Sequence, residues 1–282
     1  MQNPGAPMPT QAEKAATFQA LHQSPETFVI ANPWDAGTAR LLTALEFKAL
    51  STTSAGLAFT LGLRDAAGQV TRDQALANAR SIVEATHLPV AADLENGYGH
   101  TPEAVAETIC LAAQSGLVGG SIEDATGDPA NPIYDFNHAV ERIAAAAAAA
   151  NSLPFPFMLV ARAENFLHGR PNLDDTIRRL QAFEAAGTEV LYAPGITRAE
   201  DIRTVCASVS RPVNILMGVK GVPPLSVADL HSLGVRRISI GSGFARAALT
   251  AFLHAAREVR DHGTFTFTEE TLYMSELIDL FQ

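Results

Sequence analysis

Charged side chains follow three consecutive strand candidates in this sequence. Asp93 and Glu95 come at the end of the third apolar run, Glu123 ends the fourth, and Arg162 ends the fifth. If these runs are neighbouring parallel strands, the carboxylates meet at one rim, where like charges this close repel one another. Protonation or a bound cation relieves such repulsion, and oxygen ligands without His or Cys suit Mg²⁺ or Mn²⁺.

A metal site is therefore our first interpretation of this rim. Mg²⁺ usually takes only one or two protein carboxylates directly and keeps several waters, so we expect Asp93 to be the direct ligand. Glu95 and Glu123 would then act directly or through water. The alternative is that these acids merely cap the following helices or pair with arginine. For a single acid that alternative would be preferred, whereas three acids on neighbouring strands favour the metal.

Two polar groups near these acids could hold a substrate. Arg162 carries a planar fork that can bind a carboxylate at two points, although it could instead neutralise Glu123 or Glu164. Ser54 and Gly56 follow the second apolar run and offer a hydroxyl and backbone amides to an oxyanion or a second carboxylate. A tight turn is the alternative at that position.

These residues need elements that bring them together. Short apolar runs alternate with longer segments of helical period almost to the end of the chain, which is typical of βα units. Eight parallel strands with interleaved helices, and no linker rich in Pro, Gly or Ser, favour one closed (β/α)8 TIM barrel over a doubly wound open sheet. The expected strands are residues 28–32, 47–53, 89–93, 119–123, 157–162, 188–193, 212–216 and 237–241.

Local signals mark the ends of several helices between these strands. Starts are expected at Thr71, Thr101 and Thr197, whose hydroxyls can accept hydrogen bonds from free backbone amides. Two helices are expected to end at Gly116 and Gly187, where positive φ angles are tolerated.

Further helices are expected outside the barrel. One precedes it over residues 11–22, and another follows it over residues 268–281. The apolar positions of the latter need a surface to bury them, which a neighbouring subunit could supply. Residues 1–10 read as a mobile tail, and residues 11–282 as one barrel domain.

Composition excludes several other classes of protein. The chain has 282 residues, 47% hydrophobic and 18% charged, with only strand-sized apolar runs, which argues against disorder and membrane spans. The net charge is −10 and no basic run is visible, which argues against a nucleic-acid partner. Cys110 and Cys206 lie far apart and predict neither a disulfide framework nor a metal site. The sequence thus predicts a cytoplasmic protein without a secretion signal.

Six segments together resemble the isocitrate lyase and phosphoenolpyruvate mutase superfamily, in the same order along the chain. The resemblance covers roughly residues 25 to 250, and the combination is far more specific than any single motif. The segments are NPWDAG at 32–37, TTSAG at 52–56, LGLRD at 61–65, ADLENGYG at 92–99, IED at 122–124 and ARAEN at 161–165.

The resemblance implies a (β/α)8 barrel whose last helix is exchanged with a neighbouring subunit in a dimer or a homotetramer. It also implies Mg²⁺-dependent chemistry on small 2-oxo or 2-hydroxy carboxylates through an enolate-like intermediate. Asp93 matches the metal ligand, and Glu95 and Glu123 match the acids that hold metal-bound waters. Arg162 matches the clamp on the substrate carboxylate, and Asp65 matches the aspartate of a mobile lid. We therefore assign Arg162, Asp65 and Glu123 to catalysis.

Other matched residues are expected to bind the substrate or line its pocket. They are Trp34, Asp35, Ser54, Ala55 and Gly56. We add Tyr192 and Asn214, from the sixth and seventh strand candidates, as further substrate-binding candidates.

The loop after the fourth strand departs from the superfamily pattern. Lyases of the isocitrate and methylisocitrate type carry Lys-Lys/Arg-Cys-Gly-His there, and their Cys acts as acid or base. Phosphonomutases place a Lys and an Asn in the same loop. This chain has Asp-Ala-Thr-Gly-Asp-Pro at 124–129, so isocitrate cleavage and phosphoryl transfer are both disfavoured.

The expected function is a Mg-dependent lyase that decarboxylates oxaloacetate or performs a related carbon–carbon cleavage, because the metal supplies the electron sink. The proton for the enolate would come from a metal-bound water, Tyr192 or a lid residue. Three alternatives stay open. They are carbon–phosphorus cleavage of phosphonopyruvate with Thr126 as a lid hydroxyl, a Schiff-base aldolase that uses Lys220, and a barrel that binds 2-oxo acids without turnover.

Overall fold

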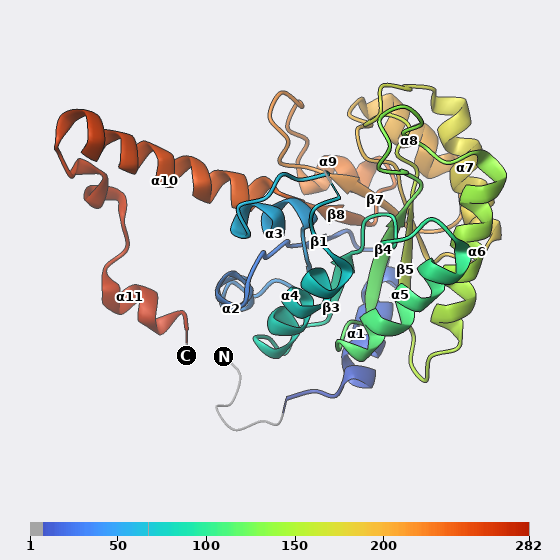
Figure 1. Cartoon of the computed structure of the whole chain (residues 1–282), viewed down its shortest axis with the longest axis horizontal. Coiled ribbons are helices and arrows are strands. Elements are labelled where there is room, and N and C mark those ends of the chain that lie inside the picture. Colours follow the sequence, from blue (N-terminus) through green and yellow to red (C-terminus); the bar gives the residue numbers. More distant parts are fainter. Residues whose placement is uncertain (1–7, 67, 282) are drawn as a thin grey trace.

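Eight parallel strands form the centre of the protein, as seen in a computed structural model that describes residues 8–66 and 68–281 (Figure 1). They are β1 (Phe28–Ile30), β2 (Leu50–Ser51), β3 (Val90–Asp93), β4 (Gly119–Glu123), β5 (Met158–Arg162), β6 (Val190–Tyr192), β7 (Val213–Leu216) and β8 (Arg237–Ser239). Each lies within a range expected from the sequence. The strand order is β1-β8-β7-β6-β5-β4-β3-β2, and a parallel bridge between Ala31 and Leu50 joins the two ends. The sheet is thus the predicted (β/α)8 barrel, and the open-sheet alternative is wrong.

Helices follow the strands and surround the barrel. They are α1 (Gln11–Gln23), α2 (Ala36–Ala44), α3 (Ser54–Thr60), α4 (Arg72–Glu84), α5 (Pro102–Gln114), α6 (Phe136–Asn151), α7 (Leu173–Ala185), α8 (Ala199–Ser208), α9 (Val227–Ser232), α10 (Gly243–His262), the 3-10 helix η1 (Thr266–Glu270) and α11 (Met274–Asp279).

Most of the predicted helix ends are confirmed. Thr71 and Thr101 cap α4 and α5, and each accepts a hydrogen bond from a backbone amide of its helix. Gly116 and Gly187 have φ angles of 88° and 102°, which side chains with a Cβ rarely adopt. The start expected at Thr197 is wrong by one residue, because Arg198 occupies the cap position of α8 and makes no side-chain cap bond.

The two ends of the chain differ from the expected pattern in different ways. The single helix expected over 268–281 is wrong, because η1 and α11 are separate and Thr271 between them is extended. The expected tail over 1–10 falls on residues 1–7, which lie outside the described residues, and on the start of α1. Thr10 caps α1 in a capping box with Glu13.

The barrel core has two parts. Between sheet and helices lies a large apolar cluster that includes Ile109, Ile143 and Phe183. A second cluster, with Phe28, Val160 and Tyr192 among its members, fills the inside of the barrel. Phe18 of α1 belongs to this inner cluster and is fully buried. The helix α1 therefore closes the amino-terminal end of the barrel, and the polar strand ends lie at the other end.

The last three elements, α10, η1 and α11, form an arm that extends away from the barrel. Figure 1 shows α10 extending away from the other helices, with η1 and α11 beyond it. Several large apolar side chains on this arm are exposed: Leu249, Phe252, Leu253, Val259, Phe265, Leu272, Tyr273, Met274, Leu277, Ile278 and Phe281.

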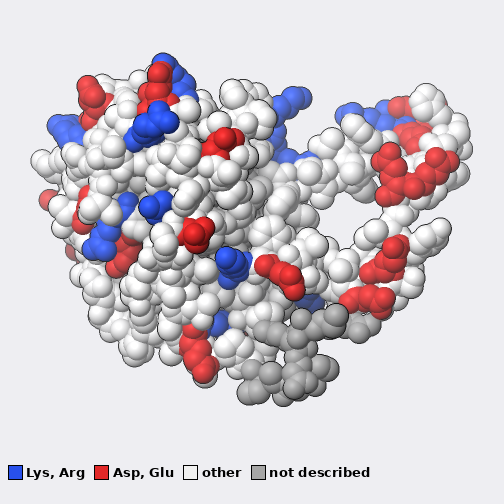
Figure 2. Space-filling model, turned by 180° about the vertical axis from the view of Figure 1, so that it is seen from behind, with Lys and Arg blue, Asp and Glu red and all other residues white. Residues whose placement is uncertain are grey.

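The surface of the barrel carries charged side chains of both signs. Figure 2 shows positive and negative side chains interspersed on the face that it presents, without a continuous basic stripe there. Within residues 8–66 and 68–281, no helix combines the length and the apolarity needed to cross a bilayer.

Candidate active site

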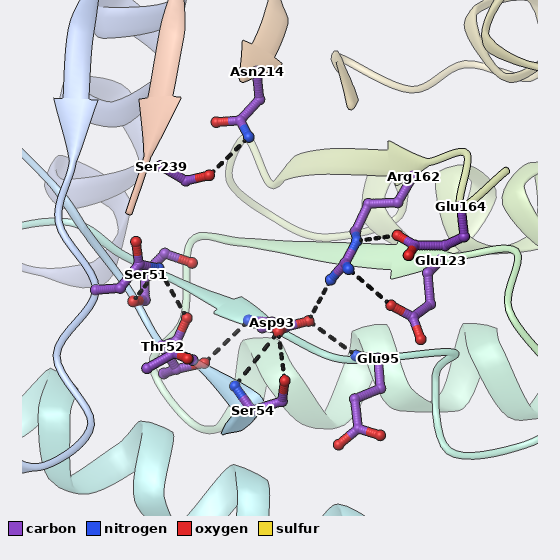
Figure 3. A network of polar contacts seen from close by, with 12 residues as sticks. Ser51, Thr52, Ser54, Asp93, Glu95, Glu123, Arg162, Glu164, Asn214 and Ser239 are labelled. Atoms are coloured by element: carbon purple, nitrogen blue, oxygen red, sulfur yellow. Dashed lines mark hydrogen bonds and ion pairs between the residues drawn. The ribbon is translucent and has the colours of Figure 1, made fainter. Parts of the chain in front are cut away.

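Arg162 lies at the centre of a group of acids at the carboxyl ends of the strands (Figure 3). Its Nη1 is 2.9 Å from Asp93 Oδ1, its Nη2 is 3.0 Å from Glu123 Oε2, and its Nε donates to Glu164 Oε1 at 2.8 Å. The side chain of Glu164 is only 3% exposed, so this acid is held inside the protein. One guanidinium thus bridges acids from three consecutive strands or their ends.

The register of the sheet explains this convergence. Glu123 pairs with Arg162 between β4 and β5, and Asp93 pairs with Ser121 between β3 and β4. Ser121 and Glu123 are two residues apart, so they point to the same side of the sheet, which is the inside of the barrel. The structure thus brings Asp93, Glu123 and Arg162 together at one rim, as expected from their positions at the strand ends.

The segment after β2 contacts the same group. The Ser54 hydroxyl donates to Asp93 Oδ2 at 2.9 Å, and the Asp93 amide donates to the Thr52 hydroxyl at 3.0 Å. Thr53 caps α3, which begins at Ser54, so this segment is the start of a helix and the tight-turn alternative is wrong. Gly56 is packed closely, because a Cβ there would lie 2.7 Å from Thr53 Cγ2.

Glu95 is placed by an unusual backbone. Its φ angle is +47°, and Tyr98 three residues later has a φ of +56°. Burial, together with the charges of Asp93 and Asp65, raises the pKa of Glu95 to about 7, while Arg162 and a hydrogen bond with Tyr98 oppose that rise. The charges of the neighbouring acids therefore act on Glu95, although the described contacts include no direct bond between Glu95 and Arg162.

The lid aspartate expected from the sequence faces this group. Asp65 forms a hydrogen bond with Ser54 and lies in a loop between α3 and α4. Burial raises its pKa, and the charge of Asp93 raises it further. The structure thus places Asp65 close to the acids of the rim.

Burial and charge set the protonation of the central pair. Burial raises the pKa of Glu123 well above its usual range, while Arg162 opposes that rise. Burial would lower the pKa of Arg162, but Glu164, Glu123 and Asp93 raise it well above its usual range, so the guanidinium stays charged.

The donor chemistry of the rim fits a divalent cation. Five carboxyl groups, from Asp65, Asp93, Glu95, Glu123 and Glu164, lie near a single guanidinium, so ionisation of all five would leave an excess of negative charge. In the part of the chain that the structure describes, no three acidic, His or Cys side chains already converge as a ready cage for an ion. Mg²⁺ needs only one or two carboxylates and completes its shell with water, so such a cage is not required.

Two of the expected substrate-binding residues lie deeper in the barrel. Tyr192 is buried, and the Arg162 guanidinium carbon lies 5.3 Å from the centre of its ring. Asn214 is 1% exposed and donates to the Ser239 hydroxyl at 2.9 Å. Figure 3 shows the side chain of Asn214 pointing toward Ser239 and apart from Asp93. The structure therefore brings Tyr192 to the site and leaves Asn214 outside its centre.

Trp34 and Asp35 lie beside the site on the β1–α2 loop. The Asp35 carboxylate caps α2 and accepts a hydrogen bond from the Thr38 amide at 2.7 Å. Trp34 lines an apolar cavity of about 230 Å³ between α3 and α10. The other lining residues are Gly56, Phe59, Thr60, Ala245, Ala248, Leu249 and Phe252.

Among the described hydrogen bonds and ion pairs, neither residue of the alternative functions contacts the acids around Arg162. Lys220 is exposed in the loop between β7 and α9. The Thr126 hydroxyl donates to the Asn131 carbonyl at 2.6 Å, so it is used within its own loop.

A buried ion pair behind the site was missed by sequence reasoning. Arg179 of α7 donates to Asp124 Oδ2 at 3.0 Å, and Asp124 Oδ1 accepts the Glu164 amide at 2.8 Å. Burial raises the pKa of Asp124 to about 6. No local pattern signals this ion pair, because Arg179 and Asp124 lie 55 residues apart in the sequence. Glu164, in contrast, was named from the sequence as a possible partner of Arg162, and its Oε1 accepts from Nε.

Known proteins resemble this chain in sequence and in fold. A protein of Burkholderia cenocepacia, described as a lyase or mutase, has a structure that matches with a TM-score of 0.93 and 55% identity over 96% of each chain. The 2-methylisocitrate lyase of Escherichia coli is 29% identical over 88% of this chain and 84% of its own. The oxaloacetate decarboxylase of Chromohalobacter salexigens is 28% identical over 90% of this chain and 88% of its own.

A family model gives the assignment. The model for phosphoenolpyruvate phosphomutase matches residues 18–260, which include every strand of the barrel. The chain therefore belongs to the phosphoenolpyruvate phosphomutase family, within the isocitrate lyase and phosphoenolpyruvate mutase superfamily of lyases and mutases.

Proposed function

We propose that the protein is a Mg²⁺-dependent lyase that cleaves a carbon–carbon bond in a small 2-oxo or 2-hydroxy dicarboxylate, most simply by decarboxylation of an oxaloacetate-like diacid. The observation that carries this proposal is the group of Arg162, Asp93 and Glu123 at the strand ends. A guanidinium binds a carboxylate, and the surplus acids suit a cation.

Arg162 is the group that would hold the substrate carboxylate. In the structure its Nε, Nη1 and Nη2 each face one acid. Binding of a substrate carboxylate to Nη1 and Nη2 therefore requires Asp93 and Glu123 to turn away. Glu164 would stay bonded to Nε and would fix the plane of the Arg162 guanidinium. Its buried position therefore supports a defined orientation of the substrate.

Asp93 would hold the Mg²⁺ directly, and Glu95 and Glu123 would hold it directly or through water. Mn²⁺ has similar preferences. When bound, the metal supplies the electron sink that stabilises an enolate. Ser54 would fix the orientation of the Asp93 carboxylate through the hydrogen bond to Oδ2.

The reaction itself needs few further groups. In decarboxylation of an oxaloacetate-like substrate, the bond between C3 and the distal carboxylate breaks, CO₂ leaves, and the electron pair stays as the enolate. That enolate then takes a proton at C3. Tyr192 is one candidate donor, because its ring lies beside the Arg162 guanidinium, whose carbon is 5.3 Å from the ring centre. The loop that carries Asp65 would exclude water during these steps.

The relatives support carbon–carbon cleavage as the reaction class. The protein of Chromohalobacter salexigens is named an oxaloacetate decarboxylase, and that of Escherichia coli a 2-methylisocitrate lyase. The loop 124–129 has no cysteine, and Cys110 and Cys206 lie on α5 and α8. Decarboxylation needs no such cysteine, because CO₂ leaves without an acid.

The alternative functions gain no support from the described contacts. For carbon–phosphorus cleavage, the Thr126 hydroxyl that the sequence offers as a lid group donates within its own loop. A Schiff-base aldolase would need Lys220, which is exposed on a loop. Binding of 2-oxo acids without turnover stays open to the assay below.

We also propose that the chain forms a homo-oligomer through α10, as a dimer or a homotetramer. Leu249, Phe252 and Leu253 recur along α10 at spacings of three and four residues and are exposed, which makes one apolar stripe. The superfamily resemblance implies that this helix is exchanged with a neighbouring subunit, which would bury the stripe. A cytoplasmic location stays a prediction.

The test is a substrate screen with and without Mg²⁺. Oxaloacetate, phosphonopyruvate, methylisocitrate and alkylmalates are offered to the wild type and to Asp93→Ala. We expect metal-dependent turnover of a 2-oxo or 2-hydroxy diacid that is lost in the variant. Borohydride trapping with pyruvate, followed by peptide mapping, checks Lys220: a reduced adduct on that residue would support the aldolase instead.

A further inference from the structure

Arg142 is a fully buried arginine whose partners are backbone carbonyls. It lies on α6 and is 1% exposed. Its Nη1 donates to the Gly99 carbonyl at 2.6 Å, and its Nη2 donates to the Asn96 carbonyl. Its guanidinium carbon lies 4.2 Å from the centre of the Tyr134 ring. Burial of an ionised group is costly, so an apolar side chain would fill this position at lower cost unless the two bonds have a purpose.

The two carbonyls belong to the loop that follows Glu95. This β3–α5 loop, residues 94–100, has left-handed φ angles of 47° at Glu95, 79° at Gly97 and 56° at Tyr98. Side chains with a Cβ adopt such angles only at an energetic cost, so contacts elsewhere must hold the loop in this shape. Within the loop itself, the Gly97 amide donates to the Leu94 carbonyl at 2.8 Å.

The helices beside the loop supply those contacts. Thr108 of α5 donates to the Gly97 carbonyl at 2.7 Å, and Arg142 takes the carbonyls on either side of it. Tyr134 lies under the guanidinium, and its hydroxyl is 2.5 Å from His100 Nδ1. The loop is therefore fastened at Asn96, Gly97, Gly99 and His100, directly after the acid Glu95.

We propose that Arg142 is a positioning residue, which fixes the β3–α5 loop so that Glu95 faces the cation site and thereby sets the affinity for Mg²⁺ or Mn²⁺. This rests on the proposed metal site. Arg142 touches neither substrate nor metal in this account, and it acts through the carbonyls of Asn96 and Gly99.

Two variants of the full-length protein test the role. Arg142→Met removes both donors, whereas Arg142→Lys keeps the charge and one donor. Titration calorimetry with Mn²⁺ alone measures affinity without reference to turnover. Loss of a group that orients a ligand typically weakens metal binding by about 10- to 100-fold. We expect a loss in that range for Arg142→Met and a smaller loss for Arg142→Lys.

Hydrogen exchange of the loop amides provides a second measurement that does not depend on the metal. We expect the Gly97 amide to exchange faster in both variants than in the wild type. Arg237→Met is the matched control, because Arg237 is a buried arginine on β8, away from this loop. We expect it to leave the exchange of the loop and the Mn²⁺ affinity unchanged.

The outcomes separate the two proposals. A folded Arg142→Lys or Arg142→Met protein with wild-type exchange in residues 94–100 overturns the role of Arg142. So does wild-type Mn²⁺ affinity in a variant whose loop exchange has changed. Failure of the wild type itself to bind Mn²⁺ overturns the metal site of the proposed function, and the link from Arg142 to cation affinity with it.

Discussion

Arg162 and Asp93 come from strands β5 and β3, with β4 between them, and their side chains meet with Nη1 2.9 Å from Oδ1. The intervening strand contributes Glu123, which takes Nη2 of the same guanidinium at 3.0 Å. The pairing of the strands thus lets one guanidinium, that of Arg162, contact acids that are distant in the sequence. Removal of this guanidinium must disturb all of the acids that it contacts.

Arg162→Gln is therefore expected to impair both activity and stability. Glu123 and Glu164 would stay buried without their partner, and breaking a buried pair in this way costs about 3–5 kcal/mol. We expect kcat/KM to fall by about 100-fold or more, since the substrate loses a charged bond of the kind worth a few kcal/mol. Steady-state kinetics and urea unfolding measure the two effects. Arg178→Gln is the control, because Arg178 is exposed. An Arg162→Gln enzyme within threefold of the wild type would contradict the clamp.

Ser54→Ala is expected to affect the metal-dependent step more than stability. The hydroxyl donates to Asp93 Oδ2 at 2.9 Å, and Asp65 also bonds to Ser54. Loss of one such bond to a charged group is worth about 1.5–3 kcal/mol, or about 10- to 100-fold in the Mg²⁺ activation constant. The constant is read from initial rates at graded Mg²⁺. Ser232→Ala on α9 is the control, and equal constants for wild type and Ser54→Ala would exclude this role.

His22 is expected to make the protein sensitive to acid. Burial and, to a smaller extent, the charge of Arg237 lower its pKa to about 3. The unfolded chain takes up the proton below its ordinary pKa of about 6.5, whereas the folded protein does not. The stability that neutral His22 contributes is therefore fully present above about pH 6.5 and is lost as the pH falls toward 3. Between pH 7 and 5 this amounts to about 2 kcal/mol.

The comparison of His22→Phe with the wild type isolates that contribution. An aromatic ring at this position keeps the edge-on packing between Phe18 and Phe28. We expect the free energy of unfolding in urea to fall less between pH 7 and 5 in the variant. His168→Gln, at an exposed position, should keep the wild-type slope. An unchanged pH dependence in His22→Phe would show that the histidine is not responsible.

The apolar stripe on α10 is expected to hold subunits together. The Phe252 side chain is 67% exposed, and Leu249 and Leu253 lie beside it on the same face. We expect the wild type to sediment as a dimer or tetramer, and the double variant Leu249→Asp, Phe252→Asp to sediment as a smaller species. His254→Gln, on the other side of the same helix, is the control. A monomeric wild type at micromolar concentration would exclude the oligomer.

Much of this fold could be predicted because its signals are local. The strand candidates are short apolar runs between helices of clear period, and each strand lies where such a run predicts it. Because parallel strands align their carboxyl ends, Asp93, Glu123 and Arg162 could also be placed at one rim from their positions in the runs.

Other features depend on contacts between distant segments and could not be predicted. The left-handed backbone at Glu95 and Tyr98 falls on residues that carry a Cβ, on either side of Gly97, and the donor to this loop, Arg142 of α6, is distant in the sequence. The hydrogen bond from Asn214 of β7 to Ser239 of β8 also could not be predicted, because the two residues lie 25 positions apart in the sequence. The last helix was expected to be continuous, yet it divides at Thr271, where the backbone is extended.

The central claim is that the acids around Asp93 hold a divalent cation on which a 2-oxo diacid is cleaved. The most direct measurement is the rate of pyruvate formation from oxaloacetate as Mg²⁺ is titrated into EDTA-treated protein. The wild type and Asp93→Asn are compared, with Asp73→Asn, an exposed site on α4, as the control. We predict saturable activation of the wild type and the control, and a rate at least about 1,000-fold lower for Asp93→Asn. Cleavage that is independent of Mg²⁺, or that persists in Asp93→Asn, would contradict the claim.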